Sequence, residues 1–99
     1  MFEQLKYDLR QIRFYYQRKK VFDEAHSIIG ENGTVDLTKK YNQAICNAMP
    51  QLYELYYKLY VEGLTQSAYA REAAYTADTV QKLHKQLLIY LQKEIYKEM

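Results

Sequence analysis

The sequence predicts an all-α fold in which five helices form a single domain. The chain has the length of one domain, 99 residues, and 48% of them are hydrophobic, as in globular rather than disordered chains. Only one Pro and three Gly occur, so few residues interrupt helices. Apolar side chains recur every three or four positions along most of the chain, which is the period of an amphipathic helix.

Composition also narrows the class of protein. The single Cys46 excludes an internal disulfide bond and fits a reducing compartment, so we expect a cytoplasmic protein. No apolar run approaches the length of a membrane span and the first residues do not form a signal peptide, so we expect no membrane partner. The net charge of +2 is only weakly basic, and bulk charge therefore lends little support to nucleic-acid binding.

The first helical stretch is amphipathic and ends near Ile29, because residues 30–33 (Gly-Glu-Asn-Gly) are a loop signal. A basic interval at residues 18–20 interrupts its apolar stripe. Either one long helix bends at this interval or two helices meet there. The stripe consists of Phe2, Leu5, Leu9, Ile12, Tyr16, Phe22, Ala25 and Ile29.

The second helix is expected to begin near Asp36, a good N-cap, and to run to Pro50, which then opens the third helix. The third helix is apolar on two sides, so we place it centrally between other helices. Gly63 is expected as the C′ residue that ends it. Its two stripes are Leu52, Leu55, Tyr56 and Leu59, and Tyr53, Tyr57 and Tyr60.

Two helices separated by a tight turn are predicted in the C-terminal part. Thr65 caps a short helix over residues 66–73, and Thr76 caps the last helix. The last helix carries a row of apolar residues spaced by three or four. This row either packs on the N-terminal helix or forms a dimer seam. It comprises Val80, Leu83, Leu87, Leu91 and Ile95.

The spacing of this pair is typical of a DNA-binding helix-turn-helix. A small residue, Ala70, stands where the two helices cross, and Ala74 occupies the turn position where Gly is usual. Val80 and Leu83 are expected to be buried against the first helix of the pair. A small core completes the motif and is predicted to contain Tyr69, Ala73 and Tyr75.

The polar edge of the last helix then faces outward and could enter the major groove of double-stranded DNA. Gln81 could pair with adenine, Asp78 with cytosine, and Lys82 or Lys85 with guanine or phosphate. The full set of base-contact candidates is Thr76, Ala77, Asp78, Gln81, Lys82 and Lys85. The phosphate-contact candidates are Thr65, Ser67, Arg18, Lys19 and Lys20.

Part of the chain resembles the fourth conserved region of bacterial sigma factors. The resemblance lies in residues 60–66 (Tyr-Val-Glu-Gly-Leu-Thr-Gln), in Ala70, and in residues 76–83 (Thr-Ala-Asp-Thr-Val-Gln-Lys-Leu). Met49-Pro50 also stands where a Leu-Pro opens the first helix of that region. The resemblance covers Met49 to Leu91, so we divide the domain into N-terminal helices, 1–48, and a sigma-like helix-turn-helix, 49–99.

This resemblance implies a DNA-binding transcription regulator of phage or mobile-element type, with RNA polymerase as a further partner. The chain departs from the family pattern in two ways. Residues 73–75 (Ala-Ala-Tyr) replace the usual Leu-Gly-Ile/Val at the turn, and the last helix carries fewer Arg and Lys than typical sigma regions.

Other interpretations of these residues stay open. The helix pair could serve only as a scaffold in a helical protein-interaction module that docks on RNA polymerase or another host protein. The basic interval 18–20 could be a solvated helix end, and the Tyr53, Tyr57 and Tyr60 stripe could be core, a dimer interface or a base-stacking platform.

No enzyme is expected, because no catalytic constellation or Gly-rich phosphate loop can be assembled from the sequence. His26 and His84 lie far apart and neither has a second ligand at i+3 or i+4, so we expect no metal site and no cofactor. Cys46 is predicted to be a small buried side chain.

Overall fold

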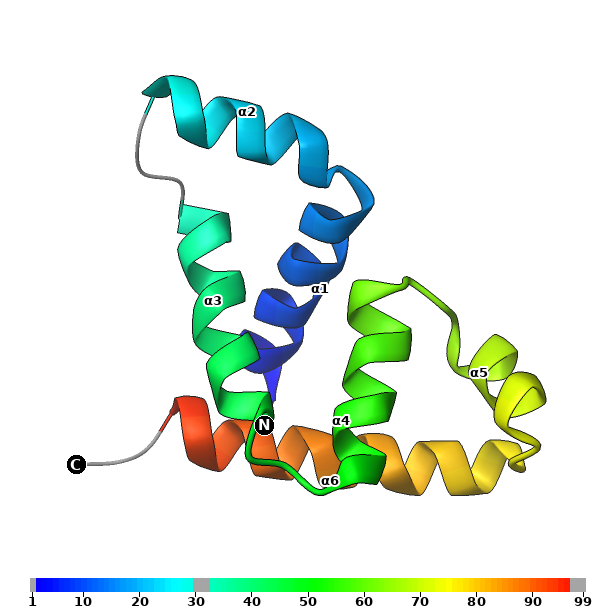
Figure 1. The fold of residues 1–99 in the computed structure, drawn as a ribbon. Helices are drawn as coiled ribbons and strands as arrows, with labels where there is room; N and C mark the ends of the chain where they lie inside the picture. The colour runs from blue at the N-terminus through cyan, green and yellow to red at the C-terminus, as the bar shows by residue number, and fades with distance from the viewer. Residues whose placement is uncertain (1, 30–32, 97–99) are drawn as a thin grey trace.

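The computed structural model describes residues 2–29 and 33–96, with side chains described everywhere in these ranges except at 25–29. The described residues are helical throughout, joined by short turns, and contain no strand, which confirms the all-α prediction. The elements are α1 (Glu3–Gln17), α2 (Lys19–Ile29), α3 (Gly33–Ile45), α4 (Pro50–Tyr56) with its extension η1 (Tyr57–Val61), α5 (Gln66–Ala73) and α6 (Ala77–Ile95) (Figure 1).

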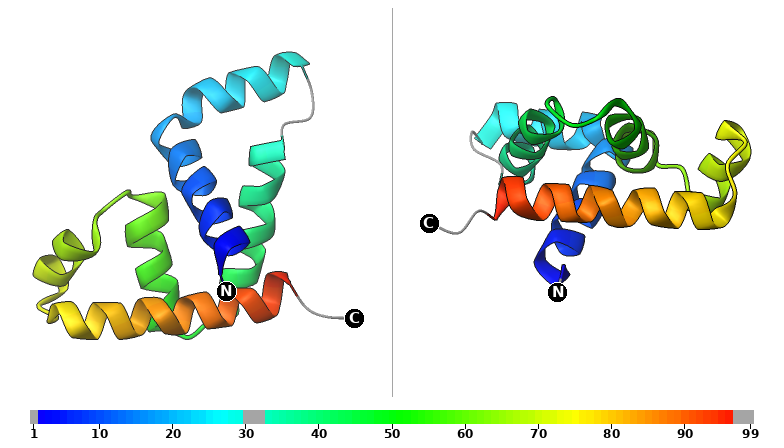
Figure 2. Two further views of the ribbon diagram at one scale, coloured as in Figure 1. Left: turned by 180° about the vertical axis from the view of Figure 1, so that it is seen from behind. Right: turned by 90° about the horizontal axis from the view of Figure 1, so that it is seen from below.

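The longest helix, α6, packs against α1, α3, α4 and α5. Figures 1 and 2 show α1, α3 and α4 rising from one side of α6, α5 folded against its N-terminal end, and α2 spanning the far ends of α1 and α3. One hydrophobic core lies where these helices meet, and its most buried aliphatic members are Leu5, Leu9, Ile12, Leu55, Leu87 and Leu91. Among the described residues, no helix is both long and apolar enough to span a bilayer.

The predicted number of helices, five, is one too low: the described residues form six α-helices, because the first helical stretch is divided into two at Arg18. The φ and ψ angles of Arg18 are −130° and 33°, and two separate helices meet there. The break lets α2 fold back, so that the ring of Phe22 lies 5.9 Å from that of Phe14 and 5.6 Å from that of Tyr15. A straight helix would carry Phe22 away from these rings and expose it to water.

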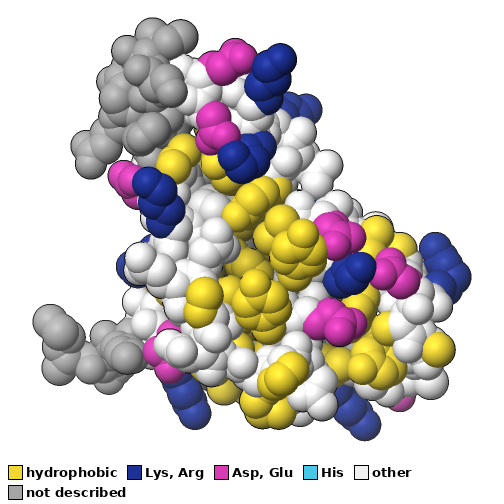
Figure 3. All heavy atoms as spheres, viewed as in Figure 1, with side chains coloured by type: hydrophobic (Ala, Val, Ile, Leu, Met, Phe, Trp, Pro, Cys, Tyr) yellow, Lys and Arg dark blue, Asp and Glu magenta, His cyan; other side chains and the backbone are white. Residues whose placement is uncertain are grey.

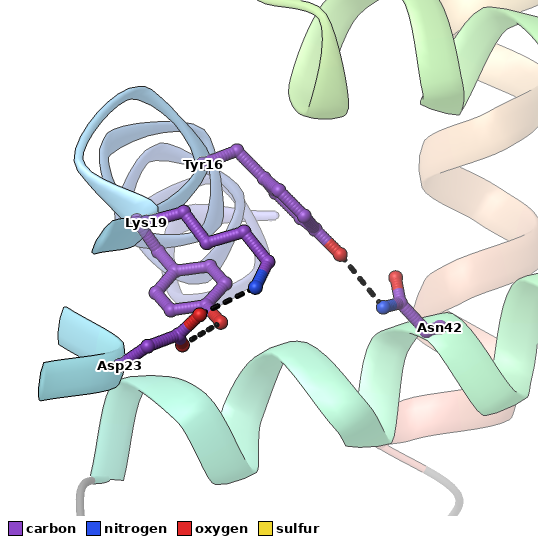
Figure 4. Close-up of polar contacts among 5 residues, drawn as sticks. Tyr16, Lys19, Asp23 and Asn42 are labelled. Atoms are coloured by element: carbon purple, nitrogen blue, oxygen red, sulfur yellow. Dashed lines mark hydrogen bonds and ion pairs between the residues drawn. The ribbon is translucent and has the colours of Figure 1, made fainter. Parts of the chain in front are cut away.

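Polar contacts hold α2 and α3 against the C-terminal end of α1 (Figure 4). The Tyr15 hydroxyl donates a hydrogen bond to Asp23 at 2.8 Å, and Lys19 pairs with the same carboxylate. The Asn42 side-chain amide of α3 donates to the Tyr16 hydroxyl at 2.8 Å. The break in the helix therefore lies at a junction that hydrogen bonds stabilise on both sides.

The structure corrects three details of α3. The helix begins at Gly33 rather than at Asp36, which lies in its first turn, because Val35 is already buried in the core. It ends at Ile45, and Cys46 is exposed rather than buried, since the chain leaves the helix there on its way to Pro50. The predicted loop at residues 30–32 and the side chain of His26 lie outside the described residues.

Pro50 opens α4 at its first position and Gly63 follows its extension η1 with a φ angle of +81°, as predicted. The second tyrosine stripe is mostly not sandwiched. Tyr53 is 45% exposed and Tyr57 43% exposed, because these two face outward from the α3–α4 side of the molecule. The helix widens at η1, where the amide of Glu62 donates to the carbonyl oxygen of Tyr57, five residues earlier.

The apolar row of α6 packs inside the molecule and does not form a free seam. Leu87 and Leu91 are fully buried, and Leu83 and Ile95 pack partly buried against the same core. Tyr90, on the neighbouring face, donates a hydrogen bond to the main-chain oxygen of Ala44 at 2.7 Å. The row is therefore packed inside the molecule, but against α3 and α4 more than against the N-terminal helix α1 that was the predicted partner.

Candidate nucleic-acid interface

The two helices α5 and α6 are each capped by a threonine, at the positions that the sequence predicts. The amide of Ala68 donates to the Thr65 hydroxyl oxygen at 3.0 Å, and the amide of Thr79 donates to that of Thr76 at 3.1 Å. These bonds satisfy amides that have no partner within the helix. The predicted bounds of the shorter helix, 66–73, are confirmed.

The turn between the helices depends on Ala74, which adopts the left-handed conformation with φ 59° and ψ 36°. The next amide, that of Tyr75, donates to the carbonyl oxygen of Ala70 at 2.9 Å and closes the turn. This conformation is ordinarily left to Gly, because the Cβ of an L-residue crowds the backbone there at a cost of about 1–2 kcal/mol. The fold therefore tolerates local strain at this turn.

The contact between α5 and α6 is small and apolar. Ala70 is 7% exposed and Val80 only 1%, so the crossing is tight. Tyr69 is buried beside them, and its hydroxyl donates to the Glu54 carboxylate of α4 at 2.7 Å, which fixes α5 to the body of the domain. Tyr75, predicted as core, is instead 38% exposed, although its ring still packs in a T-shaped arrangement with that of Tyr69, with the centroids 6.0 Å apart.

The opposite edge of α6 faces solvent. Figure 1 shows this end of α6, together with α5, extending beyond α4. The exposed side chains combine hydrogen-bond donors and acceptors with two cations. All six base-contact candidates are exposed. Asp78, Gln81, Lys82 and Lys85 lie on this edge, whereas Thr76 and Ala77, at the start of the helix, lie on the same side as Val80.

Thr65 and Ser67, the predicted phosphate contacts of α5, are both exposed. A small groove of about 90 Å³ separates the start of α5 from that of α6, and its lining includes Ser67, Ala77 and Gln81. The structure therefore brings Ser67 together with two base-contact candidates, whereas Thr65 lines a neighbouring groove with Gln66 and His84.

The other phosphate candidates lie at the junction of α1 and α2. They differ in whether a neighbouring carboxylate offsets their positive charge. Arg18 stacks its guanidinium on the ring of Phe14, 4.4 Å from the centroid, and stays exposed. Lys19 pairs with Asp23, which offsets its charge. Lys20 is exposed. Arg18 is thus better placed than Lys19 to meet a phosphate.

Arg13, absent from the predicted site, connects the two groups of candidates. Its guanidinium donates to the carbonyl oxygen of Gly63 at 2.6 Å. It lines a groove of about 270 Å³ with Thr65, Gln66 and His84, and a second, open groove of about 350 Å³ with Arg18. In the sequence, Arg13 lies on the polar side of an amphipathic helix and belongs to a basic cluster with Arg10 and residues 18–20, but neither signal reveals these neighbours.

His84 lines the groove that Arg13 shares with Thr65 and Gln66, and it follows Gln81 by about one helical turn. Its Nε2 is 2.6 Å from the hydroxyl oxygen of Tyr60. Burial lowers the pKa of the His84 imidazole below its usual value, and the charge of Lys6 lowers it further. The neutral imidazole is therefore favoured at this point of the surface.

Among the described residues, no three His, Cys, Asp or Glu side chains gather to hold a metal ion.

A different face of the molecule is rich in tyrosine. Figure 3 shows hydrophobic side chains gathered over α3 and α4. A groove of about 200 Å³ lies there, lined by Tyr16, Asn42, Ile45, Cys46, Tyr53, Tyr56, Tyr57 and Val61. Beside it, the ammonium of Lys58 lies 2.6 Å from Glu72 and 3.6 Å from Glu62, so one cation is shared by two carboxylates.

Comparisons of the chain with protein-family models, with curated proteins and with solved structures found no match.

Proposed function

We propose that the protein is a transcription regulator that binds double-stranded DNA, with α5 and α6 acting as a sigma-like helix-turn-helix. One observation carries this proposal. The first turns of α6 bury Val80, while all six base-contact candidates are exposed and four of them, Asp78, Gln81, Lys82 and Lys85, lie away from it on the helix. A helix held in this way can enter the major groove without losing its packing.

The chemistry of the exposed edge suits base edges and phosphates. Gln81 can bond adenine through its amide, and Asp78 can accept from the amino group of cytosine. Lys82 and Lys85 can reach guanine or phosphate oxygens. These side chains stand on successive turns of one helix, so they can meet neighbouring base pairs of one site.

Contacts from α5 and the α1–α2 junction complete the proposed footprint. Thr65 and Ser67 would donate to phosphates beside the major groove, and Arg18 and Lys20 would add charge. The cap at Thr65 and the positive φ of Gly63 support the likeness to sigma region four, since both positions belong to the residues that carry it. RNA polymerase is accordingly the proposed protein partner.

The test is the salt dependence of binding to a short random-sequence duplex. Release of counterions from several phosphate contacts makes the logarithm of the binding constant fall steeply with the logarithm of salt concentration, by about 0.9 per contact. Selection from a pool of random duplexes then shows whether one sequence is preferred. Binding that is absent, or indifferent to salt, would contradict the proposal.

A protein-interaction module is the second candidate, and the tyrosine-rich groove favours it. Tyr53 and Tyr57 are exposed on its lining, and Met49, at the start of α4, is 58% exposed. Aromatic and methionine side chains are enriched at protein interfaces. This candidate predicts almost no slope in the salt series, together with loss of partner binding when Tyr53 and Tyr57 are replaced by Ser.

A further inference from the structure

Three basic residues on α1 form a stripe that is separate from the proposed phosphate contacts. Lys6, Arg10 and Arg13 are spaced by four and three residues, so they lie on one side of the helix. We call them the α1 basic stripe. Lys6 and Arg10 are exposed and Arg13 is half-buried.

Arg13 of the stripe lies close to α6, since it lines a groove together with His84. Lys6 is close enough to His84 to lower the pKa of its imidazole. His84 follows Gln81 by three residues, which is about one helical turn. Figure 2 shows α1 crossing α6 near its middle, so the stripe approaches α6 where the two helices cross and not along its length.

A chain of three grooves joins the two surfaces. Gln81 and Gln66 line the first groove, between α5 and α6. Gln66 and Arg13 line the second, and Arg13 and Arg10 line the third. The path from the base-contact edge to the stripe is thus continuous along the surface.

We propose that the phosphate backbone of the bound duplex continues over the α1 basic stripe. This inference rests on the proposed function. The occupant follows from charge complementarity, because three cations in a row match a row of phosphates. Lys6 and Arg13 are seven residue steps apart, about 10 Å along a helix, and this equals the axial length of about three phosphates of one strand. Glu3 interacts with Lys6 and offsets part of its charge, so Arg10 and Arg13 contribute most.

The test uses the full chain with Lys6→Gln/Arg10→Gln, since both side chains are exposed and Arg13 also bonds Gly63. The matched control is Lys39→Gln/Lys93→Gln, which removes two exposed lysines outside the stripe, on α3 and at the far end of α6. Fluorescence anisotropy measures binding to a random duplex and to a duplex selected by the wild type, over a range of salt concentrations.

The stripe variant is expected to lower the salt slope by about 0.9 for each lost phosphate contact. It should weaken binding to both duplexes by the same factor, because phosphate contacts carry no sequence information. The control should keep the wild-type slope. A steep wild-type slope that the stripe variant leaves unchanged would overturn this inference and leave the proposed function standing. A wild type that lacks salt-dependent binding would overturn both.

Discussion

The guanidinium of Arg13 donates a 2.6 Å hydrogen bond to the carbonyl oxygen of Gly63, although 50 residues separate the two in the chain. The bond ties α1 to the point where the chain leaves the α4 extension and turns toward α5. Gln17, one turn further along α1, lies against the same glycine. The position of the proposed helix-turn-helix relative to the rest of the domain therefore depends on this residue pair.

Gly63→Ala should destabilise the protein by about 1–2 kcal/mol, because an L-residue is strained at a φ of +81°. The added Cβ would also displace the end of the Gln17 side chain. Chemical denaturation measures the effect. Gly33→Ala is the matched control, since a Cβ there meets no atom within 4 Å and should leave stability equal or slightly higher. Equal losses in both variants would contradict this account of Gly63.

Ala74→Gly should stabilise the protein by about 0.5–1 kcal/mol, since glycine adopts the left-handed conformation of this turn without strain. Ala68→Gly, within α5, should instead destabilise it by about 0.5–1 kcal/mol. Thermal unfolding of the two variants gives opposite shifts in Tm if the turn has the conformation described. A lower Tm for Ala74→Gly would show that it does not.

Asp8 links the two ends of the chain to α3. Its buried carboxylate accepts hydrogen bonds from Gln4 at 2.9 Å, from Tyr41 at 2.8 Å, and from Tyr96 near the end of α6. Asp8→Asn would turn an amide donor toward these donors and should cost about 1–3 kcal/mol. Glu24→Gln, an exposed change on α2, should leave the free energy of unfolding nearly unchanged. Similar losses in the two variants would argue against the buried cluster.

Acid should weaken the fold partly through His84. Burial and the charge of Lys6 lower the pKa of His84 in the folded protein from its usual 6.5. The unfolded chain therefore takes up this proton first, so stability is lost as pH falls from about 6.5 toward the folded pKa. His84→Gln should remove this share of the pH dependence. An NMR titration measures the imidazole directly, and a folded pKa at or above 6.5 would contradict the prediction.

Features set by local chemistry could be predicted from the sequence. The caps at Thr65 and Thr76, the helix start at Pro50 and the turn at Gly63 each follow from a residue's own hydrogen-bonding groups or backbone preference. These residues set the bounds of the helices that hold the candidate site.

Features that depend on distant neighbours could not be predicted. The contact of Arg13 with Gly63 and the burial of Asp8 beside Tyr41 arise only when separate helices pack together. The exposures of Cys46 and Tyr75 differ from prediction for the same reason, since an apolar residue near a helix end is buried only if another element covers it. The division of the helix at Arg18 likewise depends on a tertiary contact, the packing of the Phe22 ring on the rings of Phe14 and Tyr15.

The most direct test of the account compares two double variants of α6. Gln81→Ala/Lys82→Ala removes proposed base contacts, and Gln92→Ala/Lys93→Ala makes the same change three turns further along the helix. Gel shifts at one salt concentration compare each protein on the duplex that the wild type selects and on a random duplex. We predict that the first variant loses at least about tenfold of the preference for the selected duplex, as expected for a lost base contact, while the second keeps it. Equal preference in both variants, or no sequence selected by the wild type, would contradict the claim that α6 reads DNA.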